Sequence, residues 1–434
     1  MPEFAAADPR HSKIHHFKSI IGGSIGNLVE WYDWYAYSVF ALYFSAAFFP
    51  SDNQTAQLLN TAGIFAIGFL MRPVGGWLMG AFADRKGRKT ALTLSVLLMS
   101  GGSLMIALVP GYKQIGIAAP LILVLARMIQ GFSVGGEYGT VATYLSEMAP
   151  PKLRGFYSSF QYVTSTMGQL IALSILMLLQ RFLLSPQQLG DWGWRIPFAV
   201  GSLLGLAAFY LRWNLMESTA FTNEVKPPQQ RGTIKELLKY KRETLIIIGF
   251  TIGSTVSFYT FTTYVQKFLV NTAGFSKNDS TLITIIVLLV FMLVQPFAGL
   301  LGDRFSRKKV MIVYGVLAVL TSMPIMLLLV STHSFWLATL LVLVTLLILS
   351  LNTSISAIIK AELFPVNIRS LGVSFPYALT VAIFGGTAEY VALLFKNMGH
   401  AHYFYWYLTA CLLISLITSI RMRDTVKHSK MDKD

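Results

Sequence analysis

Long apolar stretches separated by short polar loops dominate the chain. Each stretch is about 20 residues long or longer, enough to cross a bilayer core of about 30 Å. In lipid a helix satisfies its own backbone polar groups, so the pattern predicts an all-α membrane protein with twelve transmembrane helices. The predicted spans are roughly 18–48, 58–83, 90–110, 118–147, 156–181, 195–213, 244–268, 280–303, 308–330, 334–360, 370–396 and 403–420.

Two motifs between these stretches occur twice. The decapeptide GAFADRKGRK at 80–89 returns as GLLGDRFSRK at 299–308. The spacing of Glu147, Pro150 and Arg154 is repeated by Glu362, Pro365 and Arg369 at nearly the same offset. Parallel repeats of this kind predict two six-helix halves with a substrate site between them near the midplane.

The repeats and the polar segments divide the chain into five parts. The predicted halves are 18–213 and 244–420, and the most polar stretch, 214–243, is the expected linker between them. Within that linker, residues 233–240 favour a short basic amphipathic helix, either bound to the membrane surface or merely solvated. The polar ends, 1–17 and 421–434, are expected to be disordered tails.

Composition and charge placement support this topology. Only 13% of the residues are charged, whereas soluble proteins average about 25%. The net charge is +15, but most Lys and Arg residues fall in the loops on one side, which predicts that both termini are cytoplasmic. This placement argues against nucleic-acid binding. Cys411 is the single cysteine, so no disulfide framework is possible.

Five ionisable side chains fall deep within predicted spans, where charge is costly and usually functional. Glu30 and Asp33 lie near the midplane on one face of the first span, and Glu137 lies near the middle of the fourth. Arg72 is at similar depth on the second span, and Arg127 is in the outer half of the fourth. The carboxylates could carry protons or pair with the arginines, and the arginines could instead bind an anionic substrate. These alternatives remain open.

Weaker candidates follow from polar residues in other spans. Around a central cavity, Tyr138, Gln161, Tyr259 and Gln295 would donate hydrogen bonds to a polar organic solute. Arg195 follows a Trp-rich segment at the outer interface, where it could anchor the helix or attract anions. Glu389, near the outer end of the eleventh span, could be a proton-accessible gate or an interfacial residue.

The repeated loops indicate a mechanical role. Asp84 and Asp303 each end an even-numbered span, and such a carboxylate can accept backbone N–H groups at the N-terminus of a neighbouring helix. Ser306 replaces Gly87 in the second copy, so its turn is expected to be less tight. The predicted gating residues are Gly80, Asp84, Arg85, Gly87, Arg88, Glu147, Arg154, Asp303, Arg304, Arg307, Glu362 and Arg369.

These motifs resemble the signature loops of the major facilitator superfamily, which implies a cytoplasmic latch that breaks during rocking. Residues 26–33, 71–73, 130–137 and 192–198 resemble its metabolite:proton symporter family. Residues 258–264, 270–274 and 385–393 are most similar to the members that carry α-ketoglutarate. The resemblance implies a bacterial inner-membrane carrier, functional as a monomer.

The chain is therefore expected to be a proton-coupled symporter that imports a small dicarboxylate, preferably α-ketoglutarate. Arg72, with Arg127 or Arg195, would bind the carboxylates, and Glu30, Asp33, Glu137 or Glu389 would handle protons. The proton is the expected coupling ion, and no cofactor or metal is expected.

Three alternatives remain. Citrate or shikimate could be the substrate, or a zwitterion such as proline or betaine could bind a cation–π box of Trp31, Trp34 and Tyr35. A membrane-embedded enzyme is disfavoured, because the spans contain no nucleophile–base pair, metal-spaced His/Cys set or phosphate loop. A sensor without net flux would call for a long regulatory domain.

Overall fold

The computed structural model describes residues 9–50, 54–213, 217, 219–222, 227 and 231–433. The first eight residues of the predicted N-terminal tail lie outside this set, as does much of the first half of the predicted linker.

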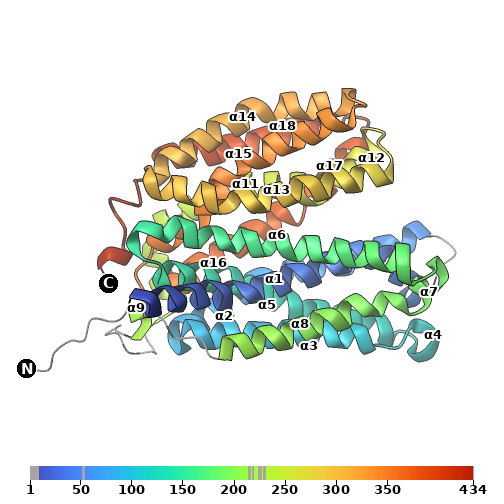
Figure 1. Ribbon diagram of the computed structural model, residues 1–434, viewed down its shortest axis with the longest axis horizontal. Helices are drawn as coiled ribbons and strands as arrows, with labels where there is room; N and C mark the ends of the chain where they lie inside the picture. Colours follow the sequence, from blue (N-terminus) through green and yellow to red (C-terminus); the bar gives the residue numbers. More distant parts are fainter. Residues whose placement is uncertain are drawn as a thin grey trace, which may run out of the picture.

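Six long helices build the N-terminal half, drawn in blue to green in Figure 1. They are α1 (Pro9–Phe48), α2 (Gln54–Lys86), α3 (Arg88–Leu108), α5 (Ala118–Met148), α6 (Arg154–Leu178) and α8 (Ile196–Trp213). Short elements connect them: α4 (Tyr112–Ile115), η1 (Pro151–Leu153), η2 (Leu179–Leu183), α7 (Pro186–Asp191) and η3 (Gly193–Arg195).

The C-terminal half, drawn in yellow to red, repeats this arrangement. Two of its spans contain a π-helical turn, which lets the helix continue with a local bulge. The half consists of α11 (Lys241–Phe258) with η6 (Tyr259–Tyr264) and α12 (Val265–Asn271), α13 (Lys277–Arg304), α14 (Arg307–Ser331), α15 (Phe335–Glu362), α16 (Arg369–Thr380) with η7 (Val381–Gly385) and α17 (Ala388–Asn397), and α18 (His402–Arg421). The linker contains α9 (Thr219–Thr222), α10 (Ile234–Leu237) and η5 (Leu238–Tyr240), and η8 (Met431–Lys433) ends the described chain.

Within the described residues, eleven helical segments are long and apolar enough to cross a membrane. The remaining long helix, α1, has 40 residues and packs along α6 and α8. It contains two carboxylates, Glu30 and Asp33, and contacts the other spans of its half. We count α1 as the twelfth span, so the predicted fold class is confirmed.

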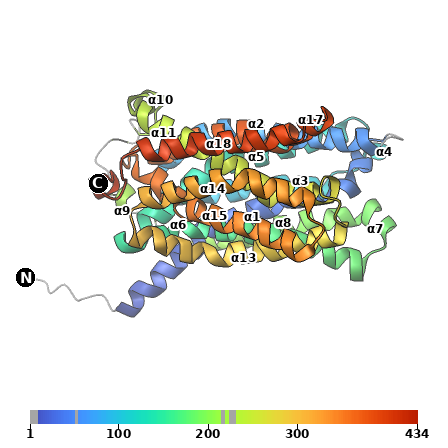
Figure 2. The same ribbon diagram turned by 90° about the horizontal axis from the view of Figure 1, so that it is seen from above.

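The two halves meet along two equivalent seams. In one, α2 packs against α16, and in the other, α6 packs against α13. Each seam pairs the second span of one half with the fifth span of the other. Gly80 contacts the backbone of Leu371, and Gly155 contacts the backbone of Gly299, so a side chain at these positions would force the helices apart. Figure 2 shows the same long helices from above, running in a common direction.

The described parts of both predicted tails, residues 9–17 and 421–433, are ordered rather than disordered. Helix α1 begins at Pro9, well before the predicted residue 18. At the other end, the Lys430 backbone N–H donates to the Glu362 carbonyl (3.0 Å), and the Lys430 ammonium pairs with Glu243 (2.8 Å). Asp432 pairs with Arg154 of the N-terminal half (2.7 Å). These contacts order the C-terminal segment against both halves.

Candidate transport site

The end of the molecule that carries residues 84–88 and 303–307, called here the signature end, is closed by two equivalent carboxylates. Asp84 accepts from the backbone N–H groups of Ser370 (3.0 Å) and Leu371 (2.9 Å) in the first turn of α16. Asp303 accepts from those of Gly155 (2.6 Å) and Phe156 (2.9 Å) in the first turn of α6. Each carboxylate therefore binds a helix N-terminus of the opposite half, where the helix dipole favours an anion.

Two ionic clusters surround these carboxylates. In the first, Glu147 accepts from Arg88 (3.2 Å) and from Arg369 of the opposite half (2.7 Å).

The second cluster repeats the first in the other half. Glu362 pairs with Arg307 and lies 3.9 Å from Arg154 of the opposite half. All of these guanidinium and carboxylate groups except Arg154 are almost fully buried. The repeated motifs thus form a latch that holds the halves together at the signature end.

Other predicted gating residues have local roles. The Arg85 guanidinium donates to the Arg231 carbonyl in the linker (3.0 Å), and Arg304 is exposed beside Phe305. Gly87 has a φ of 103°, whereas Ser306 has a φ of −62° and caps α14 with its hydroxyl. The second loop therefore avoids the left-handed conformation that only glycine adopts easily, and the two turns differ as expected.

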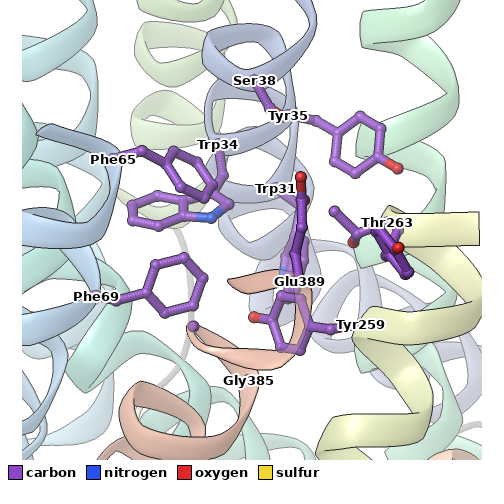
Figure 3. Close-up of a pocket in the computed structure, with 12 residues that line it drawn as sticks. Trp31, Trp34, Tyr35, Ser38, Phe65, Phe69, Tyr259, Thr263, Gly385 and Glu389 are labelled. Atoms are coloured by element: carbon purple, nitrogen blue, oxygen red, sulfur yellow. The ribbon is translucent and has the colours of Figure 1, made fainter. Parts of the chain in front are cut away.

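Between the halves lie two small cavities that share Tyr259. The larger, about 50 Å³, is lined by aromatic residues of α1 and α2 on one side and by η6, η7 and α17 on the other. Figure 3 shows Trp34, Phe65 and Phe69 facing Tyr259 and Thr263 across it. Ligand pockets usually enclose about 300 Å³ or more, so the site is nearly occluded.

Arg72 lies at the edge of this larger cavity. Its guanidinium stacks on Phe69 (4.0 Å) and Trp34 (4.3 Å) and donates to the Tyr259 hydroxyl of the opposite half (3.0 Å). It is 4% exposed, and in the described chain it has no carboxylate within salt-bridge distance. Its only hydrogen-bond partner among the described residues is therefore a phenol rather than a carboxylate.

Arg127 is the second arginine whose guanidinium packs against the Trp34 ring. Its guanidinium lies 4.1 Å from the Trp34 ring and 4.3 Å from the Tyr37 ring, and it donates to Gln130 (2.8 Å). Two of its nitrogens have no hydrogen-bond partner among the described residues. The predicted arginines are thus brought together, with one indole shared between them.

Glu30 and Asp33 do not form the ion pairs considered from the sequence. Both oxygens of Asp33 and one oxygen of Glu30 lack hydrogen-bond partners in the described structure, although both residues are buried. Asp33 lies directly against Gly201 of α8, where any side chain would collide with its carboxylate. Glu30 interacts electrostatically with Arg72, Glu137 and Arg212.

Glu137 has a partner that the sequence analysis missed. The fully buried Arg212, in the last turn of α8, donates to one Glu137 oxygen, and Ser95 donates to the other. Gly26 of α1 packs directly on the Arg212 guanidinium. The sequence did not indicate this ion pair, because Arg212 lies close to the linker, where an arginine is expected to anchor a helix at the membrane interface.

The smaller cavity, about 10 Å³, brings together three of the predicted substrate residues. Tyr138, Gln161 and Tyr259 line it, and the rings of Tyr138 and Tyr377 stack with centroids 3.4 Å apart. This volume is about that of one water molecule.

Three further predicted substrate and proton residues have partners away from Arg72: Gln295, Arg195 and Glu389. Gln295 hydrogen-bonds Thr353 (2.8 Å) inside the C-terminal half, and Arg195 donates to the Val109 carbonyl (3.2 Å) at the end opposite the latch. Neither lines the two cavities. Glu389 does line the larger one, where it pairs with Lys267 (2.6 Å).

Sequence reasoning also missed Lys360. It is a 1% exposed lysine on α15, and it donates to the Tyr138 hydroxyl (2.6 Å). Glu362, two positions later, belongs to a repeated motif, whereas Lys360 belongs to none.

Two helical halves with a central occluded site and a cross-half latch define a membrane transporter. The chain belongs to the family described as "Sugar (and other) transporter", whose pattern matches residues 20–231 and 222–432. It is 49% identical to the "Alpha-ketoglutarate permease" of Escherichia coli (strain K12), over 95% of each chain. It is 33% identical to the "Citrate-proton symporter" of Salmonella typhi, over 94% of each.

A solved structure supports the fold. The major facilitator superfamily proton:xylose symporter XylE superposes with a TM-score of 0.81, covering 97% of this chain and 98% of XylE at 19% identity. The fold that the resemblance to the major facilitator superfamily implies is therefore confirmed.

Proposed function

We propose that the protein is a proton-coupled symporter that imports a small dicarboxylate, with α-ketoglutarate preferred. The observation that carries this proposal is the pair Arg72 and Arg127. Both guanidiniums are buried beside Trp34, and neither has a carboxylate within salt-bridge distance in the described residues. Buried charges are normally paired, so a carboxylate substrate completes the site.

Trp34 also argues against a zwitterionic osmolyte. A quaternary ammonium would need the open face of an aromatic ring, and two guanidiniums already lie against the Trp34 indole. The strong likeness to a protein named α-ketoglutarate permease favours that dicarboxylate over citrate or shikimate.

Glu30 and Asp33 are the proposed proton carriers. They are buried near the arginines, and a carboxylate without hydrogen-bond partners is costly to keep charged. Protonation of Glu30 removes a negative charge that interacts with Arg72, which strengthens the attraction between Arg72 and an anion. A dianion moving with two protons is electroneutral, whereas one proton leaves a charge that costs about 2.3 kcal/mol per 100 mV.

In this proposal the carrier acts as a monomer in a bacterial inner membrane, with the signature end facing the cytoplasm. The positive-inside distribution of Lys and Arg supports this orientation. The latch is closed, and the larger cavity is lined in part by Glu389 of α17. Helix α17 lies towards the end of the molecule opposite the latch (Figures 1 and 2). The structure then corresponds to a nearly occluded state that opens outward.

Uptake of labelled α-ketoglutarate into proteoliposomes of the purified protein tests the proposal. An inward proton gradient should drive accumulation, and unlabelled dicarboxylates should compete, while proline and betaine should not. Gradient-driven uptake of proline or betaine, without uptake of α-ketoglutarate, would overturn the substrate assignment. Uptake of α-ketoglutarate that ignores the gradient would overturn the coupling.

A further inference from the structure

Lys360 is a further buried cation at the centre, and unlike Arg72 and Arg127 it comes from the C-terminal half. Its ammonium lies 4.2 Å from the Tyr377 ring centroid, 4.5 Å from that of Tyr138 and 5.2 Å from that of Phe250. Among the described residues no carboxylate lies within salt-bridge distance of it. Its strongest contact is the hydrogen bond to the Tyr138 hydroxyl.

Lys360 and Arg72 are arranged in the same way across the boundary between the halves. Arg72 of the N-terminal half donates to Tyr259 of the C-terminal half (3.0 Å). Lys360 of the C-terminal half donates to Tyr138 of the N-terminal half (2.6 Å). In each case a buried cation is bonded to a neutral phenol of the opposite half.

Both cations contact tyrosines that line the smaller cavity. Tyr138, Tyr259 and Tyr377 all line it, Lys360 packs on the rings of Tyr138 and Tyr377, and Arg72 donates to the Tyr259 hydroxyl. Helical side chains point towards the helix N-terminus. On α15 this direction leads away from the latch residue Glu362, so the Lys360 ammonium reaches inward to Tyr138.

We propose that Lys360 binds the second carboxylate of the substrate, while Arg72 binds the first. This inference rests on the proposed function. Carboxylate oxygens accept stronger hydrogen bonds from a cation than phenol oxygens do, so each carboxylate displaces one tyrosine hydroxyl. Two positive groups neutralise a dianion in the buried site, and the bound dianion bridges the two halves. A monocarboxylate can occupy only one of the two positions.

A pair of ligands tests this assignment on the wild-type protein without any substitution. The pair is α-ketoglutarate and 2-oxopentanoate, which has a methyl group in place of the distal carboxylate. Isothermal titration calorimetry of the full-length protein in detergent should show α-ketoglutarate binding about 10- to 100-fold more tightly, the range for a hydrogen bond to a charged group. Equal binding of the two ligands would overturn the assignment, and no binding of α-ketoglutarate would instead refute the proposed function.

Variants at residue 360 assign the effect to the lysine. Lys360→Met should weaken α-ketoglutarate binding about 10- to 100-fold and leave 2-oxopentanoate binding unchanged. Lys360→Arg, which keeps the charge, should retain most of the discrimination. Lys239→Met, which removes an exposed linker charge, is the matched control and should bind both ligands as the wild type does. Equal weakening of both ligands by Lys360→Met, or of neither, would overturn the proposal.

Discussion

The signature end and the centre of the molecule use buried charge in opposite ways. At the signature end, guanidiniums and carboxylates pair with one another, and the pattern of Asp84 and Glu147 is repeated by Asp303 and Glu362. At the centre, Arg72 lacks an ionic partner. A paired and repeated network holds two halves together, whereas unpaired charges are available to a substrate and to protons.

The largest effect is expected from Arg72→Ala. Removal of the guanidinium should weaken α-ketoglutarate binding about 100-fold or more, because two charge-assisted hydrogen bonds are each worth about 1.5–3 kcal/mol. Uptake into proteoliposomes and calorimetric titration would measure the loss. Substantial uptake by Arg72→Ala would remove the basis for placing the substrate at the centre.

Arg212→Met should be the most destabilising change. It leaves Glu137 buried without its counter-ion, which costs about 3–5 kcal/mol. Thermal unfolding in detergent would report the change, and the double variant with Glu137→Gln should recover much of the lost stability. A stable single variant would show that the pair is not structural and would return Glu137 to the set of proton carriers.

Asp84→Asn should loosen the latch. The neutral amide can accept only one of the two backbone hydrogen bonds, a loss of about 1.5–3 kcal/mol from the closed state. Spin labels on cysteines introduced at the exposed positions 86 and 304 would show a population at longer distances. The native Cys411 is buried and should not take up the label. The Asp279→Asn substitution at the opposite end is the matched control. An unchanged distance distribution would mean that Asp84 does not hold the halves.

Glu30→Gln should impair proton-driven accumulation several-fold more than it impairs substrate exchange. The amide keeps the shape of the side chain but cannot carry a proton. Both activities would be measured in the same proteoliposomes, with Glu236→Gln in the linker as the control. Equal losses of accumulation and exchange would count against a proton role for Glu30.

Asp432→Ala should have the smallest effect. Its partner Arg154 is within the latch, but Asp432 is 52% exposed, and such pairs contribute about 0–1 kcal/mol. The spin-label distances defined for Asp84 should barely change. A shift as large as that of Asp84→Asn would mean that the C-terminal segment is part of the latch.

The helix-terminus contacts of Asp84 and Asp303 could be predicted because their motifs carry both position and chemistry. Asp84 ends an apolar span, its copy Asp303 does the same, and a carboxylate at that place has an obvious helix N-terminus to bind. The helices themselves follow from length and hydrophobicity. Only the ends, such as the start of α1 at Pro9, differ from prediction.

The central pairings could not be predicted in the same way. Counting 1.5 Å per residue gives the depth of Glu30 or Arg72, but not the neighbouring helix that each side chain faces. Glu137 is predicted near the middle of its span, but the sequence does not reveal that its partner Arg212 comes from the last turn of another helix. Lys360 was missed, although it lies only two positions before the latch residue Glu362.

The most direct test of proton-coupled symport is to measure proton entry during entry of the substrate. Proteoliposomes loaded with a pH-sensitive dye, with no imposed gradient, would receive external α-ketoglutarate. We expect acidification of the lumen by the wild type and none by Arg72→Ala. Uptake of α-ketoglutarate by the wild type without acidification would contradict the coupling.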